Sequence, residues 1–395
     1  MRNALTLRPV TVSRERYPDM VAPVTATQTI LAPDAEVETP ALIVSEEILH
    51  NNISRTASFA KSVGVDVRPH IKTHKTPQIT RLQIAAGAIG ITCAKVGEAE
   101  VMVHEAGVQD VLLAYPTFGI NKFERLVALM DKARIIQAVD SLAAAKMLSE
   151  TMARFDAHMD VMIEVNTGQD RSGVAYGKET VELAKEVARL PNLHLVGIMT
   201  HEGQANGADP DDIERVATKA GEDMVATANA IRSEGIELTT VSVGSTPAGF
   251  ITPRVEGVTE MRPGTYVFND NSALRYGQLG VEDMAARFVA TVVSRPAADR
   301  AILDTGAKTL AMDPSRGHKG HGYIVDHPDA IIIKLSEEHG VVHVPEGETG
   351  FEIGDRVEVV PNHVCPTVNL MDEMLIVRDG HVVDTWQIAA RGKVR

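Results

Sequence analysis

Apolar and polar residues alternate regularly along the chain from residue 41 onward. Residues 41–44 form a short apolar run, which predicts a strand, and residues 46–60 follow with apolar side chains at helical spacing. The same unit then recurs, and most of the later strand-like runs are separated by amphipathic stretches of helix length. Eight such runs lie near residues 66–71, 89–93, 110–115, 134–139, 160–165, 194–199, 239–243 and 258–262.

Strands that alternate with helices predict a parallel sheet. Eight of them suit a closed (β/α)8 barrel of TIM type, which occupies about 250 residues. A doubly wound open sheet is the alternative, but the first turn lacks the G-x-G-x-x-G pattern that favours it. We therefore predict an α/β fold with a (β/α)8 barrel over residues 38–285.

The pattern changes after about residue 285. Short apolar runs such as 287–294, 330–334 and 374–377 are separated by turn sequences with Gly, Asp and Pro. This predicts a C-terminal β-rich domain over residues 286–395. Residues 1–37 show little periodicity, and we interpret them as an N-terminal extension.

Composition narrows the classes of function. The 395-residue chain has a formal net charge of −14 at pH 7, so an acidic surface would repel nucleic acid. No apolar run approaches the ~20 residues of a membrane helix, and no apolar segment of a secretory signal follows the N-terminal arginines. Two cysteines, Cys93 and Cys365, make no disulfide framework. We expect a cytoplasmic protein that binds neither nucleic acid nor membrane.

The segment Arg68–Lys75 (RPHIKTHK) lies at the C-terminal end of the first predicted barrel strand. Active sites of such barrels lie at this end of the strands. A basic turn with solvated lysines is one interpretation. The other is an amine whose pKa is lowered by the cationic neighbours Arg68, His70, His74 and Lys75, and which forms a Schiff base with a carbonyl. Strand alternation favours Lys72 over Lys75, because it puts Lys72 on the same face as His70.

Two late loops carry small and hydroxyl residues directly after predicted strands. They are Val241–Pro247 (VSVGSTP) and Glu260–Tyr266 (EMRPGTY). Either one alone can be an ordinary turn. Because phosphate sites in such barrels use the loops after the last two strands, we expect the pair to be able to hold one phosphate together.

Arg171 and His201 each follow another predicted strand. Arg171 can face an anionic oxygen or a carboxylate, or it can be a surface ion-pair partner. His201 can stack on a ring or be a hydrogen-bonded core residue. Both alternatives stay open from the residues alone.

His363 and Cys365 stand two residues apart in the β-rich domain. On a strand, that spacing puts imidazole and thiol on one face, and the pair suits zinc or a similar ion. Two protein ligands leave open positions for water and substrate, as a catalytic metal requires. The pattern is short, however, and is often incidental.

These segments in this order resemble the fold-type III pyridoxal-phosphate (PLP) family that contains D-threonine aldolase and D-serine dehydratase. The resemblance covers about residue 38 to the C-terminus. It rests on Thr39-Pro40, Arg68–Lys72, Ile91–Glu98, Gly244–Thr246, Arg262–Tyr266, Ser336–Gly340 and Pro361–Cys365.

The resemblance implies an alanine-racemase-like barrel with a C-terminal β domain, and it implies roles for nine residues. Lys72 matches the lysine that carries PLP, and Arg171 matches an arginine near the cofactor ring. His201, which can stack on a ring, is expected to bind the cofactor as well. His363 and Cys365 match the ligands of a divalent metal, which we expect to be Mn, Zn, Co or Mg. The positions that match the phosphate grip are Gly244, Ser245, Thr246, Gly264 and Tyr266.

The implied activity is that of a PLP- and metal-dependent lyase on D-3-hydroxy amino acids, in a homodimer. Cys365 favours dehydration of D-serine or D-3-hydroxyaspartate, because several aldolases of the family have aspartate there. The C-terminal sequence around residues 366–392 favours the aldolase, so we predict D-threonine cleavage to glycine and an aldehyde. A racemase and a PLP carrier without catalysis are more distant alternatives. His363 acts with the metal, and His339 is one candidate for the base on the metal side.

Overall fold

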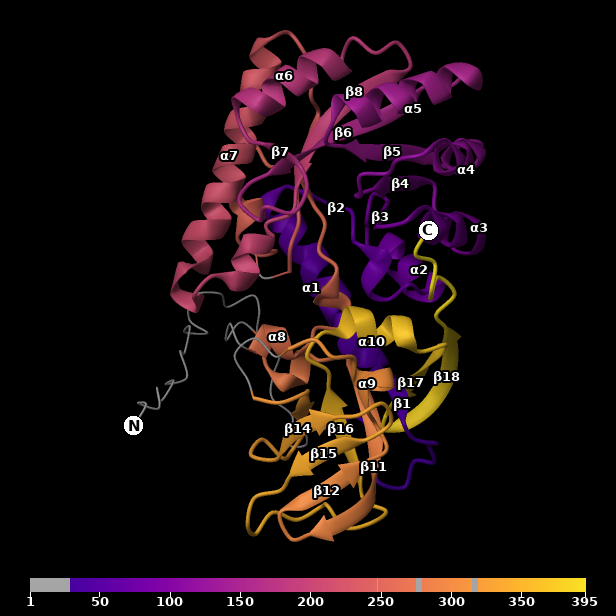
Figure 1. Ribbon diagram of the computed structural model, residues 1–395, viewed down its shortest axis with the longest axis vertical. Coiled ribbons are helices and arrows are strands. Elements are labelled where there is room, and N and C mark those ends of the chain that lie inside the picture. Colours follow the sequence, from indigo (N-terminus) through magenta and orange to yellow (C-terminus); the bar gives the residue numbers. More distant parts are fainter. Residues whose placement is uncertain (1–28, 247, 275–278, 315–318) are drawn as a thin grey trace.

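The computed structural model describes residues 29–246, 248–274, 279–314 and 319–395. The first 28 residues of the predicted N-terminal extension therefore lie outside the described residues. The described chain forms a barrel region with peripheral helices and, beside it, a second region made mostly of strands (Figure 1).

Eight parallel strands form the barrel sheet, in the order β3-β4-β5-β6-β8-β9-β10-β2. A bridge between His70 and Thr92 links the two ends of this order. The predicted TIM-like barrel is thereby confirmed. The strands are β2 (Asp66–Val67), β3 (Ile91–Cys93), β4 (Asp110–Leu113), β5 (Arg134–Val139), β6 (Met159–Asn166), β8 (Leu193–Thr200), β9 (Thr240–Val243) and β10 (Glu260–Met261).

Of the helices of the barrel region, those that follow β3, β4, β5, β6 and β8 pack their apolar sides on the barrel, as amphipathic helices do. A short strand β7 (Val174–Ala175) pairs with β6. The helices are α1 (Glu46–Val63), α2 (Pro77–Ala85), α3 (Val96–Glu105), α4 (Ile120–Met130), α5 (Leu142–Arg154), α6 (Lys178–Val187) and α7 (Ile213–Ser233).

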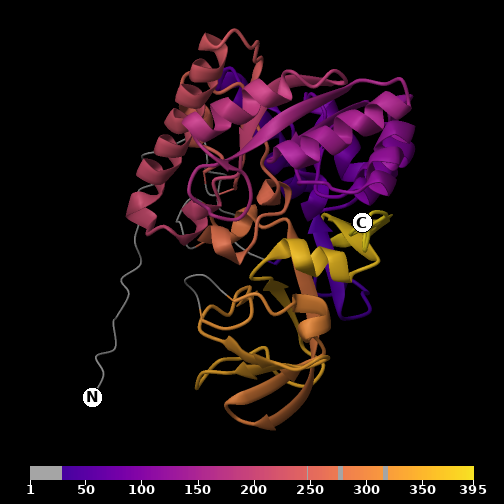
Figure 2. The same ribbon diagram turned by 45° about the horizontal axis from the view of Figure 1, so that its top comes forward.

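The second region contains a sheet with the order β14-β15-β12-β11-β1-β17-β18, in which β16 pairs with β11 and β13. It confirms the predicted β-rich domain. Its strands are β1 (Ala41–Ser45), β11 (Ala286–Ala297), β12 (Arg300–Leu303), β13 (Tyr323–Ile324), β14 (Ile331–Leu335), β15 (Gly340–His343), β16 (Arg356–Val360), β17 (Glu373–Arg378) and β18 (His381–Gln387). Short helices α8 (Asn271–Leu274), α9 (Ala307–Leu310) and α10 (Val364–Leu370) accompany them, and α10 lies between the sheet and the barrel (Figure 2).

Strand β1 differs from the sequence prediction. It falls in the range 38–285 assigned to the barrel, yet it pairs antiparallel with β11 and parallel with β17 in the second sheet. An apolar run shows that a strand is buried but not which strands it pairs with. Helix α1 then carries the chain from this sheet to the barrel, and the Ser45 hydroxyl caps it by accepting a hydrogen bond from the Ile48 N–H (3.3 Å).

Two predicted strands differ in the structure: one ends earlier than expected, and the other is the start of a helix. Strand β2 stops at Val67, and residues Ile71–Thr73 form a 3-10 turn, η3. His363 is the extended N-cap residue of α10, so Cys365 lies in the first helical turn and not on a strand. Pro366 is compatible with this, because the first turn of a helix does not need its N–H.

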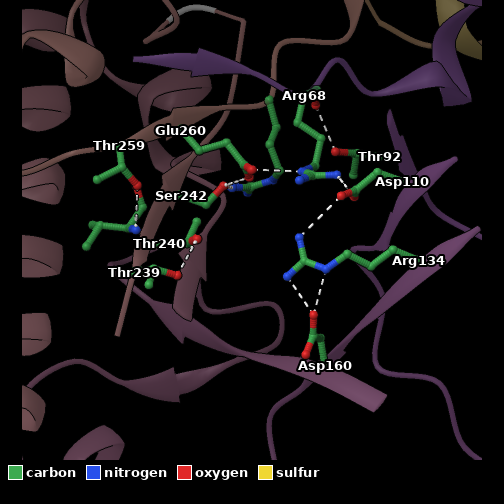
Figure 3. A network of polar contacts seen from close by, with 12 residues as sticks. Arg68, Thr92, Asp110, Arg134, Asp160, Thr239, Thr240, Ser242, Thr259 and Glu260 are labelled. Carbon is green, nitrogen blue, oxygen red and sulfur yellow. Dashed lines mark hydrogen bonds and ion pairs between the residues drawn. The ribbon is translucent and has the colours of Figure 1, made fainter. Parts of the chain in front are cut away.

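A network of ion pairs connects the barrel strands below the site (Figure 3). Arg68 donates from Nε to Glu260 (2.7 Å) and from its terminal nitrogen to Asp110, and its own side chain is 3% exposed. Arg134 bridges Asp110 and Asp160 on neighbouring strands. Because Arg68 comes directly before the turn that contains Lys72, this network fixes the start of that turn.

Within the described ranges, no helix combines the length and apolar character needed to cross a membrane.

Candidate active site

A cavity of about 820 Å³ opens at the C-terminal ends of the barrel strands. Loops from the second domain complete it on one side. All ten residues predicted for cofactor or metal line this cavity, although they come from six separate segments of the chain. They are Lys72, Arg171, His201, Gly244, Ser245, Thr246, Gly264, Tyr266, His363 and Cys365.

Lys72 lies in the turn η3, between the barrel and α10. Burial lowers the pKa of its ammonium, and the charges of Arg171 and Arg262 lower it further, against the opposing effects of Cys365 and Glu98. The direction agrees with the sequence analysis, but the cause differs. The basic neighbours named in the sequence analysis contribute little to the lower pKa of Lys72, because the cost of removing its charged form from water dominates.

The basic neighbours of Lys72 are held by partners of their own. Lys75 forms a buried ion pair with Glu98 (Nζ–Oε1, 2.7 Å), and Arg68 pairs with Glu260 and Asp110. Lys75 therefore does not offer a free amine. Lys72 is the lysine of this segment that lines the cavity.

The loops after β9 and β10 lie against each other, as expected for a shared anion site. Thr265 donates from its hydroxyl to the Thr246 hydroxyl (2.5 Å). A Cβ on Gly244 would lie 2.8 Å from the Arg262 Cβ, and one on Gly264 would lie 3.0 Å from the Thr73 hydroxyl. The two glycines thus let these loops pack closely against their neighbours, because a Cβ at either position would crowd the segment beside it. Pro247 lies outside the described residues.

Tyr266 belongs to a chain of buried polar groups whose hydrogen bonds fix the positions of their protons. His74 Nδ1 accepts a hydrogen bond from the Thr76 N–H (3.1 Å), so His74 carries its proton on Nε2 and donates to Gln83 Oε1 (3.2 Å). The amide of Gln83 then donates from Nε2 to the Tyr266 hydroxyl (3.0 Å). Burial lowers the pKa of His74 to about 3, so this tautomer persists at neutral pH.

Arg171 and Glu164 stand on the β6 side of the cavity. Their nearest charged atoms, Nη2 and Oε1, are 3.9 Å apart, and the Ser172 hydroxyl donates to Glu164 Oε1 (2.8 Å). Glu164 Oε2 is buried without a hydrogen-bond partner among the described residues, and burial raises the pKa of this carboxyl. An orphaned buried oxygen at a cavity wall fits a bound polar ligand.

His201 is oriented by the backbone of the neighbouring strand. Its Nδ1 lies 2.5 Å from the Gly244 carbonyl oxygen, so Nδ1 carries the proton and donates. Burial lowers the pKa of His201 to about 3, with the charges of Lys72, Arg171 and Arg262 acting in the same direction. The imidazole is therefore neutral at physiological pH, and Nε2 can only accept.

His363 and Cys365 face the cavity from the second domain. His363 Nδ1 pairs with Asp313 Oδ1 at 2.8 Å. Burial alone lowers the pKa of His363, but the hydrogen bond and charge of Cys365 and the carboxylates of Asp313 and Asp270 outweigh it and raise the pKa to about 9. In the part of the chain that the structure describes, no three His, Cys, Asp or Glu side chains converge as a metal-ligand cluster. The pair with its carboxylate partner still fits an open metal site, since metal-binding histidines commonly bond a carboxylate through the second nitrogen.

Several lining residues escaped the sequence analysis. Lys95 and Tyr115 each stand two residues beyond a barrel strand, so the rule that singled out Arg171 and His201 could have found them. Asp313 lies in a loop without any recognisable pattern. His339, the predicted candidate base, is exposed between β14 and β15 and does not line the cavity.

Comparison with known proteins agrees with this architecture. The family model of the alanine racemase N-terminal domain matches residues 44–272, and a serine dehydratase domain matches residues 285–377. The chain is 34% identical to a D-threonine aldolase of Arthrobacter sp. over 91% of this chain and 94% of the relative. It is 31% identical to a D-threo-3-hydroxyaspartate dehydratase of Delftia sp. over 89% and 97% of the two chains.

The crystal structure of D-threonine aldolase from Filomicrobium marinum superposes with a TM-score of 0.85 and 34% identity, covering 93% of this chain and 99% of that one. The protein described here therefore belongs to a family of fold-type III PLP enzymes. Members of this family have an alanine-racemase-like barrel, and they include D-threonine aldolases and D-serine dehydratases.

Proposed function

We propose that this protein is a PLP- and divalent-metal-dependent lyase of D-3-hydroxy amino acids, and that it cleaves D-threonine to glycine and acetaldehyde. One observation carries the proposal. The cavity contains both a lysine with a lowered pKa, Lys72, and the His363–Cys365 pair from the other domain. A carbonyl cofactor needs such an amine in order to form a Schiff base. A substrate hydroxyl that leaves or reacts beside this cofactor needs a Lewis acid.

PLP would be held by the residues of the barrel. Lys72 would carry it, Arg171 and His201 would face its ring, and the loops at Gly244–Thr246 and Gly264–Tyr266 would grip its phosphate. Bound there, PLP would supply an electron sink for the bonds at the substrate's α-carbon. In the dehydratase alternative, the depressed pKa of Lys72 supports a second task, because a neutral amine can accept a proton from the α-carbon.

The metal would be held by His363 and Cys365, with Asp313 orienting the imidazole through its hydrogen bond to Nδ1. The ion, which we expect to be Mn, Zn, Co or Mg, would polarise a hydroxyl oxygen of the substrate. Thiolate and imidazole ligands favour zinc or cobalt among these. The Thr73 hydroxyl, 3.2 Å from Cys365 Sγ, would keep the thiol turned toward the lysine side of the cavity.

Dehydration is the second candidate, and Cys365 favours it. The same machinery would remove the α-proton and release the 3-hydroxyl of D-serine or D-3-hydroxyaspartate, giving an oxo acid and ammonia. The relative named as a D-threo-3-hydroxyaspartate dehydratase lies almost as near in identity as the aldolase. A carrier protein would need no His–Cys pair in its cavity, which argues against that alternative.

Incubation of the purified protein with D-threonine separates these activities. Glycine and acetaldehyde support the aldolase, 2-oxobutanoate and ammonia support the dehydratase, and an epimer supports a racemase. Chelation with EDTA is expected to abolish turnover while PLP stays bound, and separate addition of the four metals identifies the ion. Replacement of Lys72 by Ala is expected to remove the visible absorbance of lysine-bound PLP. If that absorbance persists, Lys72 does not carry the cofactor.

We propose that residues 38–285 form the PLP-binding unit and residues 286–395 supply the metal. A homodimer is expected, and light scattering of the purified protein tests it. A cytoplasmic location is also proposed, and it fits two cysteines that are both free thiols.

A further inference from the structure

We propose that Lys95, held over the ring of Tyr115, binds a carboxylate of the substrate at the mouth of the cavity. This rests on the proposed function and names a group that binds the substrate. The Lys95 ammonium lies 3.4 Å from the centroid of the Tyr115 ring, and both residues line the cavity. They stand at the C-terminal ends of the adjacent strands β3 and β4, where barrels of this type bind their ligands.

Lys95 differs from the other cations of the cavity wall, because those have interaction partners in the protein or an assigned role. Arg55 pairs with Asp283, Arg171 faces Glu164, and Arg262 donates to the Ser242 hydroxyl and the Thr200 carbonyl. Lys72 is the amine assigned to the cofactor. Across the described residues, no carboxylate reaches ion-pair distance of the Lys95 ammonium.

The contact with Tyr115 orients the ammonium without neutralising it. An aromatic face attracts a cation through its quadrupole, yet leaves the full positive charge for another ligand. The Tyr115 side chain is 42% exposed, so the pair is open to molecules that enter from solvent. A lysine paired with a carboxylate would lack that free charge.

The backbone on both sides of the pair is fixed. The Lys95 N–H donates to Glu98 Oε2 (3.1 Å), and Glu98 also binds Lys75 beyond the turn that contains Lys72. On the other side, the buried Gln137 amide donates to the Tyr115 carbonyl (2.8 Å). A charge carried on two anchored loops can bind a substrate more tightly, because the loops do not have to be ordered when the substrate binds.

A carboxylate is the anion that the proposed substrates offer. Every amino acid carries one at the α-carbon, and 3-hydroxyaspartate, the substrate in the name of the Delftia relative, carries a second on its side chain. Both present the same chemistry to Lys95. The two sources are distinguished by comparing D-threonine with D-3-hydroxyaspartate.

Steady-state kinetics of Lys95→Met test the proposal. Loss of one hydrogen bond to a charged group should raise KM about 10- to 100-fold, with kcat within a few-fold and PLP content unchanged. Lys95→Arg should retain most of the affinity, and Tyr115→Leu should raise KM only about 2- to 5-fold. The matched control is Lys334→Met on the exposed face of β14, which should change neither constant.

The substrates whose KM rises identify the carboxylate that Lys95 binds. An equal rise of KM for both substrates assigns Lys95 to the α-carboxylate, and a rise for D-3-hydroxyaspartate alone assigns it to the side chain. Unchanged KM for both substrates, or loss of PLP in place of a KM effect, overturns the proposal. If the wild-type protein turns over neither substrate, the proposed function fails separately. Calorimetric titration of succinate into the wild type and Lys95→Met then tests whether Lys95 binds a carboxylate. Binding is expected only in the wild type.

Discussion

At the scale of single residues, the proton on the Tyr266 hydroxyl is directed by a histidine two contacts away. The chain Thr76 N–H to His74, His74 to Gln83 and Gln83 to Tyr266 allows only one direction of donation. Tyr266 accepts from Gln83, and its own O–H has no acceptor in the described part of the protein. Burial raises the pKa of Tyr266, so the group stays protonated. It is therefore a committed donor for an anion in the cavity.

Replacement of Gln83 by Met tests this relay. Met conserves the volume but cannot donate to Tyr266, so PLP should dissociate about two- to tenfold faster, the effect of one neutral hydrogen bond. The rate of PLP release from the holoenzyme into a scavenger measures it. Tyr266→Phe should show a similar increase, and Gln83→Met should add nothing in the Tyr266→Phe background. A further increase in that background would show that Gln83 acts by another route.

Sequence reasoning predicted which residues line the cavity better than it predicted the physical causes of their pKa shifts. The place of Lys72 at the cavity could be predicted because its segment follows a barrel strand and resembles a known motif. The cause of its lowered pKa could not, since burial and the charges of Arg171 and Arg262 are set by residues far away in the chain. The expected effect of Lys75 fails for the same reason, because Glu98 is its partner.

At the scale of elements, the turn with Lys72 is fastened to α3 and to the C-terminal tail. Lys75 has a left-handed backbone, with φ of 54°. Its carbonyl accepts from the Ala390 N–H (3.0 Å), and its ammonium binds Glu98 (2.7 Å) and the Ala390 carbonyl (3.4 Å). A residue in this conformation persists only when its surroundings hold it. The cavity therefore depends on residues that do not line it.

Replacement of Lys75 by Met should lower the free energy of unfolding by ~3–5 kcal/mol. The substitution leaves the Glu98 carboxylate buried, with a side chain 1% exposed and no ammonium beside it. Urea unfolding measures the loss, and PLP should also dissociate faster. Lys308→Met is the matched control, because Lys308 pairs with Glu337 and Glu338 on the surface and its loss should leave the unfolding midpoint unchanged. Equal effects of the two substitutions would show that burial of the Lys75 pair is unimportant.

Element boundaries show where local sequence stops being informative. The eight barrel strands could be predicted because each forms an apolar run between helical patterns. The segment at His363 was predicted as a strand and is the start of α10, because β-prone Val364 and Val368 also fit the buried side of a short helix. The pairing of β1 with β11 and β17 joins residues more than 240 positions apart. Nothing local in residues 41–45 specifies such partners.

At the scale of the whole molecule, the chain interlocks its two regions. Strand β1 lies in the middle of the second sheet, helix α1 then carries the chain to the barrel, and the chain returns to this sheet at β11 (Figure 1). The C-terminal tail then crosses back, and the Arg395 carbonyl accepts from the Gly97 N–H (2.9 Å). Removing either region would therefore expose edges and apolar faces in the other. The site lies where the two regions meet, and its geometry requires both to be folded.

This interlocking predicts one unfolding transition for both regions. The single tryptophan, Trp386 on β18, reports on the second sheet, and the circular dichroism of bound PLP reports on the barrel. Both signals should disappear at the same urea concentration, because coincident probes indicate a cooperative transition. Ile43→Ala in β1, where the side chain is 0% exposed, should shift both midpoints together through a loss of about 2–5 kcal/mol. Ile333→Ala, at a side chain 56% exposed on β14, should shift neither. If Ile43→Ala moved the tryptophan signal alone, the regions would be independent, and the Lys72 and His363 sides of the cavity would be joined only by the bound substrate and cofactor.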